Sequence, residues 1–453
     1  MSIDIRNNTE LSDVAKLFYG DGFPTVTLER ADGVFSVEID GSRYSFTYGD
    51  DYCAAIPQDR ICDRLSKIAL YDALKAHTGR SMPWGALTGV RPTKLVYEHL
   101  RRGGTLDGAV RVMHDVYRVD AKRADILRRI VNAQTGKYEF GDEYINLYVH
   151  IPYCTTRCNY CSFVSAPIGK CGEQSKAYVD LLCDEIKESK DLLFSCGKKI
   201  LSAYIGGGTP TALDEMSLDK LLTAIGELDC EYTCEAGRPD TVTAEKLEII
   251  KAHGITRVCV NPQTLNDKTL AKIGRSHSVA DFYSAYELAT RFGFDINCDL
   301  IAGLADETPS DFKASFDGIK NLAPQNITVH SLAKKNGSAI RYDSCENACV
   351  SDMIEYALDN IDGYEPYYLY RQKRQAGNLE NVGFSLSGKE CVNNITTMEE
   401  TVGVMACGAG AISKLIGSGT ITRFANMRDV PLYIERYEQK LAQKLDCFRA
   451  AFK

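Results

Sequence analysis

Three cysteines in a short segment carry the strongest chemical signal in the sequence. Cys154, Cys158 and Cys161 lie in the stretch LYVHIPYCTTRCNYCSF with C-x3-C-x2-C spacing. Three thiolates in so compact a loop can hold a [4Fe–4S] cluster and leave its fourth iron without a protein ligand. An open iron can chelate a small molecule, which an electron from the cluster then cleaves. From this loop alone a structural zinc site stays open, with Cys171 or His150 as a further ligand, as do buried free thiols.

Polar residues and glycines follow several apolar stretches and supply a second set of candidates. The segment YIGGGTPTAL holds Gly207, Gly208 and Thr209, and its glycines allow the backbone to approach a ligand closely. The remaining members follow three later apolar stretches: Glu235, Gln263 and Asp299. Each alone is more often a turn, cap or surface residue. Together, at successive strand ends, they predict a polar lining for an amino acid and a ribose.

The composition narrows the class of protein. The 453 residues suffice for roughly three domains, and the net charge of −8 argues against a nucleic-acid or anionic-membrane surface. The N-terminal stretch MSIDIRNNTE lacks a basic-then-apolar secretory signal, and no stretch is apolar enough for a membrane span. Seventeen cysteines without such a signal indicate a reducing cytoplasm. We therefore expect a cytoplasmic protein with no membrane span and no nucleic-acid partner.

The central part of the chain must position the candidate residues. From 145 to 331, short apolar stretches alternate with amphipathic ones, which predicts six strand–helix repeats and a parallel sheet. Six repeats are too few for a closed eight-stranded barrel, so an open (β/α)6 partial TIM barrel is expected. The three-cysteine loop follows the first strand and therefore lies at the carboxyl end of the sheet, where α/β folds place their chemistry.

The flanking regions have different patterns. Residues 1–140 predict a small α+β domain, in which antiparallel strands turn at Asp32-Gly33 and Asp40-Gly41 and are followed by helices. Residues 332–453 are mixed and predict a C-terminal domain that covers the substrate. The fold class is thus α/β, with domains at 1–140, 145–331 and 332–453.

Several motifs together resemble one known family. The sequences YVHIPYCTTRCNYC, GGGTPT, CEAGRPDTVT, VNPQTLNDKTLAKIGRSH and NCDLIAGL are similar to those of the radical SAM oxygen-independent coproporphyrinogen III dehydrogenases. The segments LTGVRPTKL, YYLYRQK and MACGAGAISKL are similar to the HemZ-type branch. The resemblance covers nearly the whole chain and implies two cofactors, a [4Fe–4S] cluster and S-adenosyl-L-methionine (SAM).

The resemblance also implies roles for single residues. Cys154, Cys158 and Cys161 match the cluster ligands. The positions that match SAM contacts, including those of a second SAM in relatives, are Tyr148, Tyr160, Gly207, Gly208, Thr209, Glu235, Gln263, Arg275 and Asp299. These residue types suit the ligand, since carboxylates accept from ribose hydroxyls and Arg pairs with a carboxylate. A catalytic side chain is not identified.

The family reaction is an oxidative decarboxylation in anaerobic haem biosynthesis. Two propionates of coproporphyrinogen III become vinyl groups, which gives protoporphyrinogen IX without oxygen. A reductant such as flavodoxin or ferredoxin is the expected protein partner. One position departs from the pattern, because Phe163 stands where relatives outside the HemZ branch often have a fourth cysteine. The alternatives are therefore a HemW-like haem chaperone or another radical SAM reaction on a tetrapyrrole.

A substrate with four propionates requires cations. The basic cluster Arg371, Lys373 and Arg374 lies in a tyrosine-rich segment outside the core, so that rings and cations could meet pyrroles and carboxylates. Arg91 is a weaker candidate. A solvated loop explains the charge run equally well.

Overall fold

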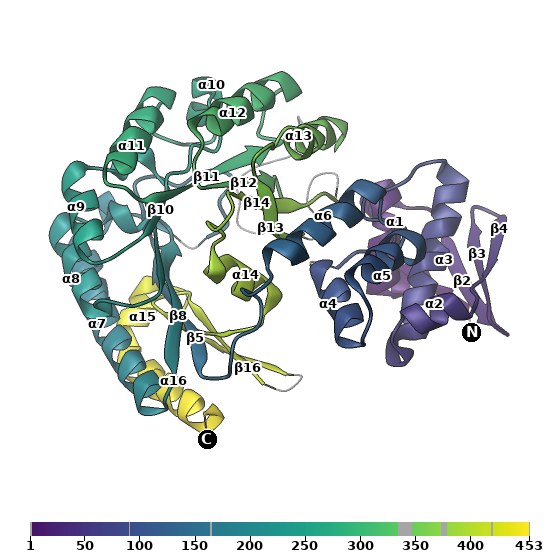
Figure 1. Cartoon of the computed structure of the whole chain (residues 1–453), viewed down its shortest axis with the longest axis horizontal. Helices are drawn as coiled ribbons and strands as arrows, with labels where there is room; N and C mark the ends of the chain where they lie inside the picture. The colour runs from purple at the N-terminus through teal and green to yellow at the C-terminus, as the bar shows by residue number, and fades with distance from the viewer. Residues whose placement is uncertain are drawn as a thin grey trace. The chain divides into compact units, whose positions relative to one another are not determined.

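The computed structural model describes residues 2–89, 91–163, 165–333, 347–372, 378–417 and 420–452. Its chain divides into two compact units (Figure 1). The N-terminal unit contains residues 1–133 and 369–380, and the core unit contains residues 134–368 and 381–453. The segment 369–380 thus belongs to the N-terminal unit despite its late position in the sequence. The three functional domains expected from the sequence stay a prediction.

The N-terminal unit contains a four-stranded antiparallel sheet with strand order β1-β2-β3-β4. The strands are β1 (Ser2–Asp4), β2 (Val26–Ala31), β3 (Val34–Ile39) and β4 (Ser42–Thr47). The turns at Asp32-Gly33 and Asp40-Gly41 have positive φ at both residues, which matches the twist of a tight hairpin. Both hairpins therefore form at the turns predicted from the sequence.

Helices complete this unit. They are α1 (Thr9–Tyr19), α2 (Asp50–Ala55), α3 (Ile61–Thr78), α4 (Thr93–Arg101), α5 (Leu106–Arg111) and α6 (Ala121–Ala133). Helix α3 ends at Gly79, whose φ of 69° gives the left-handed C-cap that glycine adopts without strain. The buried face of α3 includes Ile68, Leu70 and Leu74. It packs on α1 and on β3.

Six parallel strands form the centre of the core unit. They are β5 (Tyr144–Ile151), β8 (Lys199–Gly207), β9 (Glu231–Glu235), β10 (Arg257–Cys259), β11 (Asp295–Ala302) and β12 (Asn326–Ser331). They neighbour one another in chain order, and every pair is parallel. The sheet is open rather than closed, which confirms the predicted partial barrel.

The connecting helices follow one another along the sheet. They are α7 (Gly172–Ser195), α8 (Glu215–Ile225), α9 (Ala244–Ala252), α10 (Asp267–Lys272), α11 (Val279–Arg291) and α12 (Pro309–Leu322). Figure 1 shows α7, α8, α9, α11 and α12 in an arc outside the strands. Helices α11 and α12 begin with complete capping boxes at Ser278 and Thr308, which satisfy the first backbone N–H groups.

The last part of the chain extends both edges of the same sheet. Strand β14 (Asn381–Ser385) is antiparallel to β12, and β15 (Gly403–Cys407) is parallel to β5. The other elements here are α13 (Asn347–Asp359), β13 (Glu365–Tyr370), α14 (Val392–Glu399), β16 (Ile412–Ile416), β17 (Ile421–Ala425), α15 (Val430–Glu435) and α16 (Tyr437–Ala451). The resulting sheet has eleven strands.

A buried ion pair holds the terminal helix against this sheet. Lys444 of α16 and Glu185 of α7 are 0% and 2% exposed, and their charged atoms lie 2.8 Å apart. The Lys444 ammonium also donates to the Ala406 carbonyl oxygen, and Tyr433 donates to the Glu185 carboxylate. Burial raises the pKa of Glu185, but Lys444 outweighs it and holds that pKa below its ordinary value. The pair is therefore charged and fully bonded.

Helices of membrane-spanning length and apolarity do not occur among the residues that the structure describes.

Candidate functional site

The three-cysteine loop leaves the carboxyl end of β5. Cys154 ends the short strand β6 (Tyr153–Cys154), which pairs with β7 (Ala166–Pro167) and so closes the loop at its base. Cys158 and Cys161 lie between these strands. The loop is tied to the residues after α10, because the Asn159 amide N–H donates to the Ile273 carbonyl oxygen at 3.0 Å. These two contacts hold the cysteine loop at the carboxyl ends of the strands.

A buried arginine that the sequence reading missed contacts this loop. Arg238 follows β9, is 3% exposed, and donates from Nη1 to the Cys158 Sγ at 3.3 Å. It also donates to the Thr156 hydroxyl at 2.9 Å and to the Asp240 carboxylate at 3.1 Å. Asp240 in turn accepts from the Thr155 hydroxyl at 2.9 Å. The pair of Arg238 and Asp240 therefore contacts the loop at three residues, Thr155, Thr156 and Cys158.

Hydrogen-bond donors lie beside two of the three thiols, the Thr209 hydroxyl beside Cys154 and the Arg238 guanidinium beside Cys158. Cys154 and Cys161 are partly exposed, and Cys158 is buried. Burial raises the pKa of Cys154, while hydrogen-bond donors and Arg238 act against that rise. No three His, Cys, Asp or Glu side chains in the described part of the chain are placed around a single metal ion. A four-iron cluster puts each thiolate on a different iron, so its ligands do not need to converge on one point.

The glycine segment lies directly against the base of the cysteine loop. The Gly208 and Thr209 amides donate to the Ile151 and Tyr153 carbonyl oxygens, both at 2.7 Å. A Cβ on Gly208 would lie 2.3 Å from the Tyr153 oxygen, so only glycine fits there. The Thr209 hydroxyl contacts the Cys154 Sγ at 3.5 Å. The predicted SAM positions and the predicted cluster ligand therefore meet at this point.

Gly207 has a comparable constraint from the side chain of His150. Its φ is 102°, and a Cβ there would lie 2.5 Å from the imidazole ring. The Tyr148 hydroxyl and His150 Nδ1 are 3.1 Å apart. Any side chain at position 207 would displace this pair. The close approach of β8 to β5 at their ends thus depends on glycine.

A row of polar side chains crosses the same face of the sheet. Tyr148 stacks on Tyr204 with ring centroids 6.3 Å apart, and the Tyr204 hydroxyl donates to Glu235 at 2.7 Å. Burial, together with the negative charge of Asp299, raises the pKa of Glu235 to about 7, although the Tyr204 bond opposes the rise. Strand register explains the row, because directly paired residues point to the same face.

Asp299 has the opposite electrostatic environment. Burial raises its pKa, but His330, at 3.7 Å, and a 2.8 Å hydrogen bond from Asn297 outweigh burial and leave the pKa lowered. The Asp299 backbone carbonyl oxygen accepts from the Gln263 backbone N–H at 2.9 Å. Gln263 has a positive φ of 69°, and its buried Oε1 has no hydrogen-bond partner among the described residues. An amide oxygen in this state is an acceptor available to a ligand.

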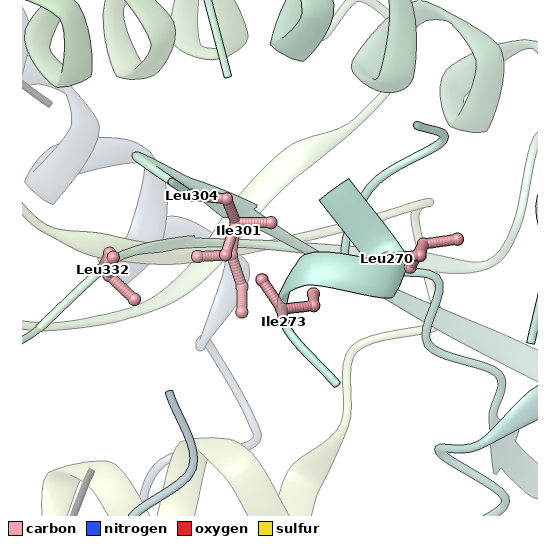
Figure 2. Packing of buried hydrophobic residues seen from close by; sticks show 5 residues of the cluster. All are labelled: Leu270, Ile273, Ile301, Leu304 and Leu332. Carbon is pink, nitrogen blue, oxygen red and sulfur yellow. The ribbon is translucent and has the colours of Figure 1, made fainter. Parts of the chain in front are cut away.

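Arg275 and Tyr160 form one unit beside the cysteines. The Arg275 guanidinium donates to the Tyr160 hydroxyl at 3.1 Å and to the Gly237 carbonyl oxygen at 3.1 Å. Tyr160 packs on a buried apolar cluster, shown in Figure 2: Leu270, Ile273, Ile301, Leu304 and Leu332. This cluster joins α10 to the ends of β11 and β12. The cluster therefore supports the Tyr160 ring beside the strand ends.

Of the three predicted substrate cations, only Arg371 lies within the described residues. Arg371 belongs to the N-terminal unit and is 2% exposed. Its guanidinium donates to the Leu87 carbonyl oxygen at 2.8 Å and lies 5.3 Å from the Trp84 ring centroid. Burial lowers its pKa to about 10. These are the contacts of a structural cation, and they lend no support to a substrate role. Lys373 and Arg374 lie outside the described residues.

Phe163, at the position where the sequence departs from the pattern expected of relatives outside the HemZ branch, is 54% exposed. The missed residues Arg238, Asp240 and Tyr204 carried no spacing signal of their own. Arg238 and Asp240 lie within the motif CEAGRPDTVT, whose resemblance to the family was the one clue available in the sequence.

Comparisons with known proteins agree with this geometry. The model of the radical SAM superfamily matches residues 148–318. The chain is 36% identical to the oxygen-independent coproporphyrinogen-III oxidase-like protein HemZ of Bacillus subtilis (strain 168), over 99% of this chain and 97% of that protein. It is 31% identical to the heme chaperone HemW of Lactococcus lactis, over 64% of this chain and 73% of HemW.

A solved structure shows the same fold. Coproporphyrinogen III oxidase (HemN) from Escherichia coli, a radical SAM enzyme, matches with a TM-score of 0.54 and 21% identity. The match covers 70% of this chain and 73% of HemN. The motifs, the open six-stranded core and the near full-length similarity lead to one conclusion: the chain belongs to the radical SAM family of HemZ, the coproporphyrinogen-III oxidase-like proteins.

Proposed function

We propose that the protein catalyses the oxygen-independent oxidative decarboxylation of coproporphyrinogen III to protoporphyrinogen IX in porphyrin and haem biosynthesis. The observation that carries the proposal is the cysteine loop, held beside the glycine segment and the polar row at the strand ends. The resemblance to HemZ along nearly the whole chain supports the choice of substrate.

The radical SAM family implies a [4Fe–4S] cluster and SAM, and the residues present fit both. Cys154, Cys158 and Cys161 would hold the cluster, and Arg238 donates a hydrogen bond to the Cys158 sulfur. When bound, the cluster supplies the electron that cleaves SAM and so allows hydrogen removal from an unactivated carbon. No described side chain is needed as a proton donor for that step.

The residues of the chain would bind and orient SAM. Gly207 and Gly208 let the end of β8 approach the base of the cysteine loop, beside which SAM would bind. Glu235 and Asp299 supply carboxylate acceptors, and the unpaired Gln263 Oε1 supplies an amide acceptor. Tyr160 offers an aromatic face, held by Arg275. Tyr148 and Thr209 complete the lining.

The reaction balances with a one-electron donor, which supplies the electron that starts each round, and a one-electron acceptor, which takes the electron that the substrate releases. Each propionate loses CO2, one hydrogen atom and one electron, and becomes a vinyl group. Each round uses one SAM and one electron to cleave it, and the substrate returns one electron to an acceptor. We propose a flavodoxin or ferredoxin as the donor, in a cytoplasmic setting.

A second function is favoured by two specific observations. The chain is 31% identical to a heme chaperone HemW over 64% of its length, and Phe163 replaces a cysteine that other relatives often carry. A chaperone would bind haem and transfer it without consuming SAM.

Anaerobic turnover separates the two. The reconstituted protein is reduced with SAM, with and without coproporphyrinogen III, and methionine, 5′-deoxyadenosine and porphyrin masses are measured. Substrate-dependent SAM cleavage with loss of two CO2 supports the enzyme, and Cys158→Ala serves as the inactive control. Haem binding without SAM cleavage, in protein with a full cluster, would instead establish the chaperone.

A further inference from the structure

One histidine of the core unit is buried without a hydrogen bond. The His277 side chain is 0% exposed, and neither of its ring nitrogens has a hydrogen-bond partner among the described residues. A buried polar atom in this state destabilises the fold, because it has lost its bonds to water and gained none in the protein. Folded proteins satisfy nearly all such atoms, and departures from that rule are expected at functional sites. The position of this imidazole therefore requires a reason other than stability.

His277 lies between α10 and α11, in a short segment that contacts the cysteine loop. The Thr156 hydroxyl of the loop donates to the Gly274 carbonyl oxygen at 2.8 Å. The Arg238 guanidinium, which also contacts the loop, donates to the Ser276 hydroxyl at 3.0 Å. The imidazole therefore belongs to the part of the core unit that surrounds the cysteines.

His277 and Arg238 face the same oxygen of Asp240. Arg238 Nε donates to Asp240 Oδ1 at 3.1 Å, and His277 Nδ1 lies 3.9 Å from that oxygen, just beyond hydrogen-bond distance. The other carboxylate oxygen, Oδ2, accepts from the Thr155 hydroxyl at 2.9 Å. A movement of about 1 Å would bring His277 Nδ1 to hydrogen-bond distance of Oδ1.

The charges around His277 favour a neutral imidazole beside an ionised carboxylate. Burial lowers the pKa of His277 to about 4, and the neighbouring Arg275 and Arg238 act in the same direction. Asp240 and Asp281 oppose this shift without cancelling it. Burial raises the pKa of Asp240, but Arg238 outweighs burial and leaves that pKa lowered. A neutral imidazole has one N–H group, and the ionised Asp240 favours the tautomer that carries it on Nδ1.

Arg238 divides its donors between Asp240 and the cysteine loop. Its Nη1 donates to the Cys158 Sγ at 3.3 Å, while its Nε donates to Asp240. A thiolate that ligates iron is a stronger acceptor than a thiol, so a bound cluster draws the guanidinium toward the sulfur. That movement weakens the bond to Asp240 Oδ1 and leaves room there for another donor.

We propose that His277 is a positioning residue for the cluster on which the proposed function rests. Its Nδ1–H replaces Arg238 Nε at Asp240 Oδ1 when the cluster is bound, and Arg238 then donates more fully to the Cys158 sulfur. Hydrogen bonds to the sulfurs stabilise the reduced, more negative cluster and so raise its reduction potential. The unsatisfied imidazole is thus a donor held in reserve for the loaded site.

The test uses the full-length protein, reconstituted anaerobically with iron and sulfide, and three variants. His277→Phe keeps a ring and removes both nitrogens, whereas His277→Asn places an N–H near the position of Nδ1. The control His114→Phe changes a histidine of the N-terminal unit that is 54% exposed. Urea unfolding is measured before reconstitution, and iron content and the midpoint potential, by EPR-monitored titration, are measured after it.

His277→Phe should unfold at the same urea concentration as the wild type or a higher one, because an apolar ring replaces two unsatisfied nitrogens. The midpoint potential of its cluster should be more negative by about 30–60 mV, a three- to tenfold change in the reduction equilibrium. His277→Asn should recover part of this shift. The control should have the potential of the wild type.

Equal potentials in His277→Phe and the wild type, both with a full cluster, overturn this inference and leave the proposed function untouched. Lower stability of both His277 variants before reconstitution would show that the ring nitrogens serve the fold, and it also overturns the inference. A wild type that binds no cluster overturns the inference together with the proposed function, so the two failures are distinguished by the iron content of the wild type.

Discussion

At the scale of single residues, two carboxyl groups on one face of the core sheet have opposite environments. Glu235 is buried beside another negative charge, and its pKa is raised to about 7. Asp299 is held ionised by His330 and Asn297. Pairs of acidic groups with separated pKa values are typical of functional sites, because at one pH the first group can be protonated while the second is ionised.

The raised pKa of Glu235 predicts a pH-dependent SAM affinity. Below pH 7 the carboxyl is mostly protonated and loses its negative charge and part of its acceptor capacity, and above pH 7 it is ionised and accepts more strongly from the ligand. Affinity should fall about tenfold between pH 8 and pH 6, because the ionised fraction falls by that factor. Calorimetry across this range tests the idea, with Glu235→Gln as the comparison. An equal pH slope in the variant would show that another group titrates.

The contacts of Arg238 predict that this residue stabilises the cysteine loop. Arg238→Met removes the donor to Cys158 and leaves Asp240 with less compensation, a loss of about 1.5–3 kcal/mol for a charged hydrogen bond. We expect less iron per chain after anaerobic reconstitution and faster bleaching of the chromophore. Arg238→Lys should recover part of both. The exposed Arg291→Met is the control, and iron content unchanged in Arg238→Met would contradict a role at the cysteines.

At the scale of elements, the site around the cysteine loop depends on helices and strands that follow the loop in the sequence. Helix α10 and the ends of β11 and β12 form the apolar cluster beneath Tyr160 (Figure 2). Strand β15 pairs with β5, from whose end the cysteine loop leaves. The core sheet is thus stabilised at that edge by a segment more than two hundred residues further on.

The buried pair of Lys444 and Glu185 predicts how firmly this edge is held. Lys444→Met leaves the Glu185 carboxylate buried without its cation, which costs about 3–5 kcal/mol. Urea unfolding should show this loss, and the double variant Lys444→Met/Glu185→Gln should recover part of it. Arg449→Met, on the exposed side of the same helix, should change stability by less than about 1 kcal/mol. Equal stability of Lys444→Met and this control would show that the Lys444–Glu185 pair does not stabilise the fold.

At the scale of the whole molecule, the features that the sequence predicted correctly are those set by residues close together in the chain. Strand β5 and helix α3 formed where their periodicity and caps placed them. The Asp32-Gly33 turn formed because its left-handed backbone is a property of those two residues. The parallel core followed from repeated strand–helix units.

Long-range packing could not be predicted in this way. The predicted substrate cation Arg371 is buried against Trp84, nearly three hundred positions earlier, and no local pattern carries that contact. Arg238 likewise reaches Cys158 only in the folded chain. The addition of β14 and β15 to opposite edges of the sheet also depends on contacts between distant segments.

The central claim is that the three-cysteine site removes a hydrogen from a propionate of coproporphyrinogen III. The most direct test supplies substrate deuterated at the propionate β-carbons to the reduced, reconstituted protein with SAM. Mass spectrometry then measures 5′-deoxyadenosine and the porphyrin. We predict one deuterium in each 5′-deoxyadenosine and a divinyl product, with neither in Cys158→Ala. Unlabelled 5′-deoxyadenosine and unchanged coproporphyrinogen, from protein with a full cluster, would contradict the account.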